Sequence, residues 1–284
     1  MNPAKIIAIV LLVSLMLHTG LQVNFAHLMS CLKNYGLLGR ALLANFVLVP
    51  IYGVLMVRLF HLSEPIAIGV LLMAISPGVP FVVFSGGRRK GGSLGFAVEL
   101  AFLLPALSII TVPITASLVL PGNANISTSS IVASLFIFQL IPLLVGILIN
   151  ERAPEVAAKL QRLVGIIVLI FVIALLALLG PAIVHAIGSI YGSRGMLAML
   201  SIVILSLLTG WVLGGSERAY RRTLSLGTAL RNIGLSSVIA TTSFGGRDVA
   251  AAVLTYFLVQ FAVVLLVGVF YTRTAKDPEA TLAA

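Results

Sequence analysis

The sequence predicts an all-α polytopic membrane protein, and three observations support that fold class. Of the 284 residues, 60% are apolar and only 9% are charged, and the mean hydropathy is +1.17. A soluble protein of this size would need more polar groups on its surface. Apolar stretches of about 20 residues, the length at which a helix crosses a bilayer, recur along the chain. These stretches are continuous rather than alternating, which indicates helices and not barrel strands.

Each apolar stretch predicts one transmembrane helix, giving nine in all. The first follows Lys5 and lacks a small-residue cleavage site, so we expect a membrane helix there and not a signal peptide. No linker separates soluble domains. We therefore expect a single transmembrane domain over 1–272, with the boundary between its halves near 121–130 and a tail over 273–284. The predicted helices are 5–22, 36–60, 65–84, 93–119, 130–150, 161–184, 195–214, 223–243 and 248–272.

The basic residues are distributed unevenly between the two sides of this nine-helix topology. Membrane proteins concentrate lysine and arginine in cytoplasmic loops. The bias therefore predicts an outside N-terminus and a cytoplasmic C-terminus, in a bacterial inner membrane or a plasma membrane. One side carries thirteen basic residues (Lys33, Arg40, Arg88, Arg89, Lys90, Arg152, Lys159, Arg162, Arg218, Arg221, Arg222, Arg273 and Lys276), and the other carries four (Lys5, Arg58, Arg194 and Arg247).

Several functional classes are disfavoured by what the sequence lacks. The net charge of +10 is explained by topology, and no basic patch alternates with stacking aromatics, so we expect no nucleic-acid partner. The single Cys31 excludes an internal disulfide and a multi-cysteine metal site. We find no catalytic motif such as HExxH or GxSxG, and we expect neither an enzyme nor a resident cofactor. Nothing in the sequence implies a protein partner.

Two charged residues fall deep inside the predicted helices, Glu99 in the fourth and Arg231 in the eighth, whereas the other charges lie near helix ends or in loops. A charge at the bilayer centre costs about 2.5–3.5 kcal/mol on insertion scales, so each is expected to meet a partner, a substrate or water. We expect the two to face each other. A permanent structural salt bridge is one reading of this pair, and a proton-carrying Glu99 is another.

The third and eighth predicted helices look interrupted. In the third, Pro77 and Pro80 remove backbone donors around Gly78, which favours two half-helices joined by extended backbone over a simple kink. The eighth gathers small and polar residues, and three of its polar positions (Thr228, Arg231 or Asn232, and Ser236) are spaced for one helical face. Interrupted helices at matching places in two halves predict a midplane binding site built from inverted repeats.

The chain resembles the bile acid:sodium symporter family, on segments that occur in the family's order. These are LMLHTGLQ, NFVLVP, ISPG and LRNIGLSS, within about residues 13–272. The resemblance implies a core domain and a panel domain, with two broken helices crossing in the core and an organic anion binding beside the crossing. Compared with ten-helix members of the family, the resemblance implies that this chain lacks the first helix. A related arsenite exporter would carry a thiol in a membrane helix, whereas Cys31 lies in a predicted loop.

Sodium coupling is where this sequence departs from the family. The resemblance implies a sodium-binding Glu and Gln on the second broken helix, and here Gly227 and Arg231 stand at those positions. Asn45 stands near a family Gln and is the one ligand-like residue retained. Our hypothesis is that the Arg231 guanidinium substitutes for the cation. Side chains without oxygen also replace the family's other sodium ligands, at Val82, Val83, Ala97 and Ala101.

These arguments predict a secondary transporter or facilitator of a small organic anion that works by alternating access and has no metal site. Two alternatives stay open: a sodium-coupled symporter with displaced sites, and a passive channel or sensor on the same fold. The other reading of the small polar residues is that they only bind membrane helices together. The predicted substrate-binding residues are Arg231, Asn232, Thr228, Asn45 and Ser236; the coupling or counter-charge residue is Glu99; and the broken-helix backbone comprises Ser76, Pro77, Gly78, Pro80 and Gly234.

Overall fold

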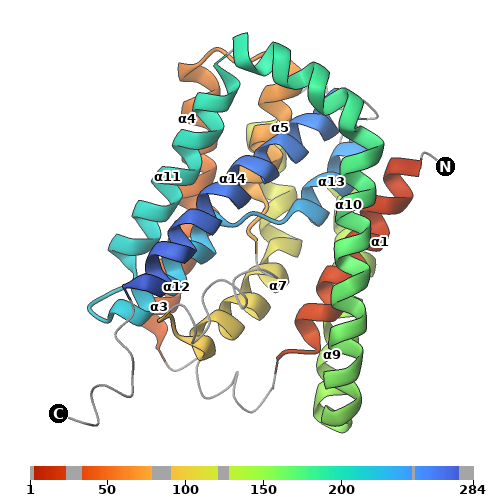
Figure 1. The fold of residues 1–284 in the computed structure, drawn as a ribbon, viewed down its shortest axis with the longest axis vertical. Helices are drawn as coiled ribbons and strands as arrows, with labels where there is room; N and C mark the ends of the chain where they lie inside the picture. The colour runs from red at the N-terminus through yellow and green to blue at the C-terminus, as the bar shows by residue number, and fades with distance from the viewer. Residues whose placement is uncertain are drawn as a thin grey trace.

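The computed structural model describes residues 3–23, 34–78, 91–120, 128–192, 194–244 and 247–274, and every regular element within them is a helix (Figure 1). The all-α prediction is confirmed for these residues. The elements are α1 (Pro3–Gly20), α3 (Tyr35–Leu43), η1 (Ala44–Leu48), α4 (Val49–Leu59), α5 (Glu64–Ile75), α7 (Leu94–Val119), α8 (Thr128–Leu135), η3 (Phe136–Leu140), α9 (Ile141–Arg152), α10 (Pro154–Gly192), α11 (Gly195–Leu213), α12 (Arg218–Ala229), α13 (Ile233–Ser243) and α14 (Arg247–Arg273).

Seven helices in the described residues are long and apolar enough to cross a membrane, which confirms a polytopic membrane protein. They match seven of the nine predicted spans to within a few residues, except that the α10 helix is longer at both ends than the predicted 161–184. The two remaining predicted spans are represented by short helices, α5 for one and α12 with α13 for the other. Pro80 and the half boundary at 121–127 lie outside the described residues, as does most of the predicted tail.

Two spans contain a π-helical turn directly before a proline. The turn η1 precedes Pro50, and η3 precedes Pro142. A proline ring clashes with the carbonyl four residues back, and widening the helix there relieves that clash. Each π turn carries one buried amide side chain, Asn45 in η1 and Gln139 in η3. The Gln139 amide donates to the Pro105 carbonyl at 2.8 Å and so ties η3 to α7.

Helix packing relies on glycine wherever two backbones approach closely. Helix α1 packs against α9 and α10, with Gly20 and Gly146 meeting backbone to backbone. Helix α14 runs diagonally across the molecule and packs against α5, α10 and α13 (Figure 1). At the α5–α14 contact, a Cβ on Gly69 would lie 3.1 Å from the Val249 carbonyl oxygen. Small residues allow such contacts in membrane helices, where close van der Waals packing drives association.

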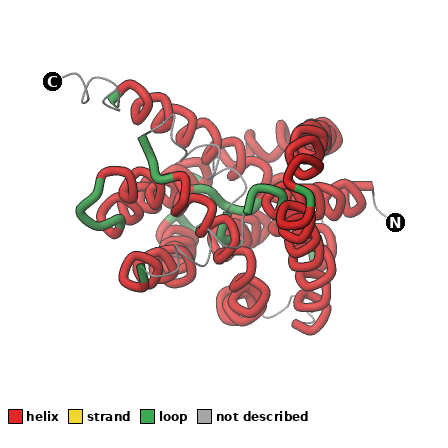
Figure 2. Tube along the Cα trace, turned by 90° about the horizontal axis from the view of Figure 1, so that it is seen from below, coloured by secondary structure: helices red, strands yellow, loops and turns green. Residues whose placement is uncertain are grey.

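The non-helical connections that interrupt two of the spans lie inside the bundle. Seen from the other direction, loop segments run through the middle of the molecule with helices around them (Figure 2). One connection is Leu230–Asn232, between α12 and α13, and the other begins at Ser76, after α5. Buried backbone without helical bonds must find other partners. These two connections therefore mark the place to look for a site.

Candidate functional site

The first break follows α5, which ends at Ile75 because Pro77 has no backbone N–H to continue the helix. The Ser76 N–H donates to the Met73 carbonyl at 3.3 Å, and the chain then becomes extended. The predicted interruption around Pro77 and Gly78 is therefore confirmed on its α5 side. Its far side, with Pro80, lies outside the described residues.

The second break spans Leu230–Asn232. The Asn232 side chain caps α13 by accepting a hydrogen bond from the Leu235 N–H at 3.0 Å. An N-cap residue leaves helical geometry, so α12 cannot continue through it. This corrects the prediction that Thr228, Arg231 or Asn232, and Ser236 share one helical face, because the break separates Thr228 from Ser236.

The two breaks pair with each other. The Gly78 N–H donates to the Leu230 carbonyl at 3.0 Å, and the Asn232 N–H donates to the Ser76 carbonyl at 3.1 Å. Pro77 and Arg231 thereby form an isolated antiparallel bridge. A Cβ on Gly78 would collide with the Leu230 carbonyl group and the Arg231 Cα. Glycine is thus the residue that lets the two backbones cross.

Gln260 on α14 holds the second break from its other side. Its Oε1 accepts from the Arg231 N–H at 3.0 Å, and its Nε2 donates to the Arg231 carbonyl at 3.2 Å. The amide therefore satisfies both backbone groups of one unwound residue. The sequence signal for this role is a lone glutamine in an apolar helix.

Replacing Gln260 with leucine should destabilise the protein, because both Arg231 backbone groups would be buried without partners. Each such group costs about 1–3 kcal/mol, so for the two groups we expect a loss of roughly 2–6 kcal/mol in the free energy of unfolding. The measurement is thermal or denaturant unfolding of the purified protein. Gln22→Leu is the matched control, since within the described residues the half-buried Gln22 amide donates to the His18 carbonyl, four residues back in the chain. Equal stability of the two variants would show that Gln260 does not hold the Arg231 backbone in place.

The Arg231 side chain is 2% exposed and lies in a cage of uncharged oxygens. Its Nη2 donates to the Thr228 carbonyl at 2.6 Å and to Asn45 Oδ1 at 3.1 Å. Its Nη1 donates to the Ala74 carbonyl at 3.3 Å and to the Asn45 carbonyl at 3.5 Å. The guanidinium thus joins α5, η1 and α12. No carboxylate among the described residues bonds to it.

Glu99 does not pair with Arg231, which corrects our expectation. Glu99 lies on α7 with 3% exposure, and its Oε1 is buried with no hydrogen bond in the described part of the chain. The physical reason is that Nη1 and Nη2 of the guanidinium donate to four oxygens of α5, η1 and α12, while its Nε has no hydrogen bond within the described residues. The protein thus buries a carboxyl group and a guanidinium separately.

The other predicted site residues divide into those that make structural contacts and those whose polar atoms are buried without a hydrogen bond. Ser236 donates to the Leu72 carbonyl at 3.2 Å and joins α13 to α5, and Gly234 packs against α1, so both have structural contacts. By contrast, three polar atoms beside the breaks are buried and form no hydrogen bond within the described residues. They are Ser76 Oγ, Thr228 Oγ1 and Asn232 Nδ2. The start of α13 adds a positive dipole end at the same place.

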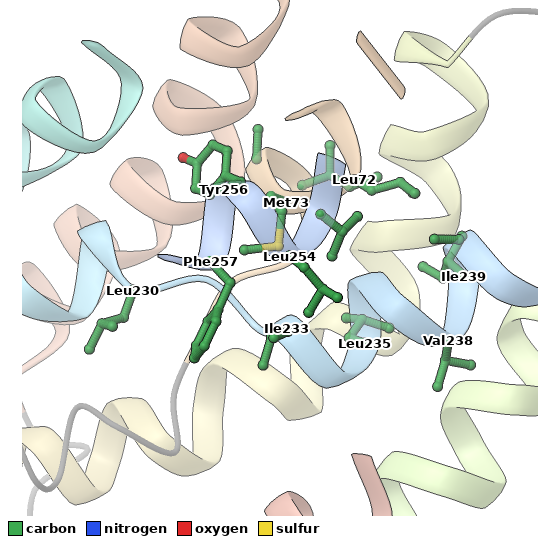
Figure 3. Close-up of a cluster of buried hydrophobic side chains, with 14 of the residues drawn as sticks. Leu72, Met73, Leu230, Ile233, Leu235, Val238, Ile239, Leu254, Tyr256 and Phe257 are labelled. Carbon is green, nitrogen blue, oxygen red and sulfur yellow. The ribbon is translucent and has the colours of Figure 1, made fainter. Parts of the chain in front are cut away.

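A cavity of about 540 Å³ lies between α1, α10 and α14, close to the second break. Leu15 lines it and also lies against Gly234, where a Cβ would be 3.2 Å from the leucine Cδ1. Phe257 lines it as well, and Figure 3 shows this ring beside the connection from Leu230 to Ile233. Apolar side chains from α5, α13 and α14 surround the connection in the same view (Figure 3). The cavity is large enough for a small organic molecule.

Comparison with known proteins identifies relatives of this architecture. The profile of the Sodium Bile acid symporter family matches residues 9–190. The chain is 24% identical over 246 residues to "Probable sodium/metabolite cotransporter BASS2, chloroplastic" of Oryza sativa subsp. japonica, covering 83% of this chain and 57% of that protein. It is 26% identical over 206 residues to "P3 protein" of Homo sapiens, covering 67% and 41%.

The rat relative aligns over more of both chains. "Hepatic sodium/bile acid cotransporter" of Rattus norvegicus is 25% identical over 280 residues, covering 94% of this chain and 76% of that protein. Against the rice protein named above, the chain spans little more than half the relative's length. The family profile itself covers well over half of the present chain. The chain therefore belongs to the sodium bile acid symporter family.

Proposed function

We propose that this protein is a secondary transporter or facilitator that moves a small organic anion across a bacterial inner or plasma membrane by alternating access. The observation that carries the proposal is the buried Arg231 guanidinium bonded to four oxygens, none of them a carboxylate in the described residues. Taking a charge out of water costs several kcal/mol. An anion bound beside the crossing would offset that cost, and the site would favour anions over neutral molecules.

The buried Arg231 also supports a transport cycle that does not use the family's sodium sites. The cage that holds the guanidinium, with Asn45 Oδ1 and backbone carbonyls, offers the oxygen ligands that a hard cation takes. Arg231 would therefore supply the positive charge permanently. Gly227 on α12 and Ala97 and Ala101 on α7 are buried positions without side-chain oxygen, which agrees with the loss of both family sites.

Direct contacts to the substrate would come from the neighbours of Arg231 rather than from its terminal nitrogens. The Nη1 and Nη2 atoms already donate to protein oxygens, so the guanidinium would act mainly through its charge. The buried Asn232 Nδ2 and the hydroxyls of Thr228 and Ser76 would contact the anionic group. The 540 Å³ cavity would receive the apolar body of the substrate.

Two groups of helices would provide the alternating access. Helices α1, α9 and α10 pack together, while α5, α12, α13 and α14 carry the crossing. The cavity lies between the groups, so a relative movement would open it first to one side of the membrane and then to the other. This arrangement agrees with the core and panel domains that the family resemblance implies.

The experiment is thermal unfolding of the purified protein with pyruvate, succinate, cholate or taurocholate, in sodium and in potassium buffers of equal ionic strength. A ligand that binds only the folded state raises the melting temperature. We expect at least one anion to raise it equally in both buffers. An increase that requires sodium would instead favour a symporter with displaced sites.

Uptake of the stabilising anion into proteoliposomes distinguishes coupled transport from passive movement through a facilitator or channel. Accumulation that collapses with a proton ionophore would favour coupling through Glu99, and the Glu99→Gln variant should then only equilibrate the same anion. Equilibration by the wild type would favour a facilitator or channel. No stabilisation by any anion, together with no uptake, would contradict the proposed function.

A further inference from the structure

A second hollow lies between α11 and α14, away from the crossing. Its volume is about 460 Å³. Ile204, Leu207 and Leu208 form the α11 wall, Val263 and Val267 form the α14 wall, and Ser225 of α12 contributes to the lining. Leu208 is 57% exposed and Phe270 beside it is 61% exposed, so the hollow is an open groove on the membrane-facing surface.

An aromatic pair and two arginines close one end of this groove. The rings of Trp211 and Tyr271 stack with their centroids 5.7 Å apart. The Arg221 guanidinium lies 5.9 Å from the Trp211 ring centroid, and the Arg222 guanidinium lies 5.3 Å from that of Tyr271. Tryptophan and tyrosine mark the level of the lipid headgroups in membrane proteins. The arginines therefore lie at headgroup depth.

The charge at this end of the groove is strongly positive. Residues 211–222 and 263–274 contain four arginines and one glutamate. Arg218 lies one turn before Arg221 and Arg222 on α12, and Arg218 and Arg273 are exposed. The exposed arginines are available to a ligand, while Arg221 is held in place by its Nε bond to the Gly215 carbonyl.

The groove also has the dimensions of a lipid chain. From Val263 to Tyr271 the α14 helix rises about 12 Å, and half of the hydrocarbon core is about 15 Å thick. The groove thus runs from the headgroup level most of the way to the bilayer centre. Its walls are apolar along that length, and its charge is confined to one end.

We propose that this groove binds an anionic phospholipid of the leaflet at the arginine-rich end of the protein. One acyl chain lies between α11 and α14, and the phosphate contacts Arg218 and Arg221. Basic pockets between transmembrane helices are the usual form of anionic-lipid sites. A second copy of the chain fits this face poorly, because a two-fold dimer here would place two arginine clusters at the same depth.

The test compares dioleoyl-phosphatidylglycerol with dioleoyl-phosphatidylcholine, two lipids with the same chains. Each is added to the purified protein in neutral detergent, and binding is followed by native mass spectrometry and by the melting temperature. We expect tighter binding of phosphatidylglycerol, weakened by about 5-fold for each arginine removed in Arg218→Gln and in Arg218→Gln with Arg221→Gln. Leu208→Trp, which fills the groove, should also reduce phosphatidylglycerol binding.

Matched controls lie elsewhere on the same molecule. Arg162→Gln removes an exposed arginine from α10, and Leu144→Trp enlarges an exposed apolar residue on α9. Both should bind phosphatidylglycerol like the wild type. Arg218 has no bond that maintains the fold in the described structure, so a loss caused by Arg218→Gln alone cannot be ascribed to misfolding. Equal binding of the two lipids, equal losses in the controls, or full stabilisation by inorganic phosphate would overturn the proposal.

Discussion

Arg231→Ala should abolish stabilisation by anions and lower the free energy of unfolding by about 3 kcal/mol. The substitution removes the positive charge from the crossing. It also leaves Asn45 Oδ1 and the carbonyls of Ala74 and Thr228 without the donors they have in the wild type. The measurements are the melting temperature without ligand and its increase on adding the anion that stabilises the wild type. Arg162→Ala, at an exposed position on α10, is the control.

Two further substitutions separate the charge of Arg231 from its hydrogen bonds. Arg231→Lys keeps the charge with fewer donors, so we expect anion stabilisation to survive in a less stable protein. Arg231→Gln removes the charge and frees the oxygen cage, so we expect sodium to begin to stabilise the protein. A folded Arg231→Ala variant that still responds fully to the anion would show that the arginine serves only to hold the helices together.

Gly78→Ala should be among the most damaging single-methyl additions in this protein. The new Cβ would collide with the Leu230 carbonyl group and the Arg231 Cα, which are backbone atoms and cannot rotate away. Separating the two breaks would also cost the bonds from the Gly78 N–H to Leu230 and from the Asn232 N–H to Ser76. We expect a loss of about 3 kcal/mol or more, measured as reduced yield of monodisperse protein and a lower melting temperature.

The control for this prediction is Gly39→Ala on α3, at an exposed position where a Cβ would meet nothing within 4 Å. Alanine favours helix over glycine by about 0.5–1 kcal/mol, so this variant should be as stable as the wild type or more stable. If Gly78→Ala were equally harmless, the two breaks could not pair as closely as the structure has them.

The helices were predictable because long apolar runs carry their own signal. The predicted 93–119 and 195–214 became Leu94–Val119 and Gly195–Leu213, and the breaks at Pro77 and near Asn232 were both anticipated. Each of these features depends on residues close together in the sequence. The π turns before Pro50 and Pro142 were not anticipated, since a proline predicts strain without specifying how the helix relieves it.

The direction of buried polar side chains could not be read from the sequence. Arg231 and Glu99 looked like partners because they were the only charges far from the ends of the predicted spans. In the structure, Nη1 and Nη2 of Arg231 instead donate to oxygens of three elements, α5, η1 and α12. The partners of Gln260, the N–H and carbonyl of Arg231, could not be specified from the sequence for the same reason. Such contacts join segments far apart in the chain, and periodicity reports only local faces.

The pairing of the two breaks also sets an order of events during biogenesis. Ala74 and Arg231, which bond across the crossing, are 157 positions apart in the chain. Helix α5 comes before α12 and α13 in the chain and is synthesised first, and its 12 residues are too few to span a bilayer. Until α12 and α13 follow, the carbonyl of Ser76 cannot receive its bond from Asn232. Membrane insertion of this protein is therefore completed only by its last helices, and a ribosome stalled before residue 232 would leave an unfinished core exposed to lipid.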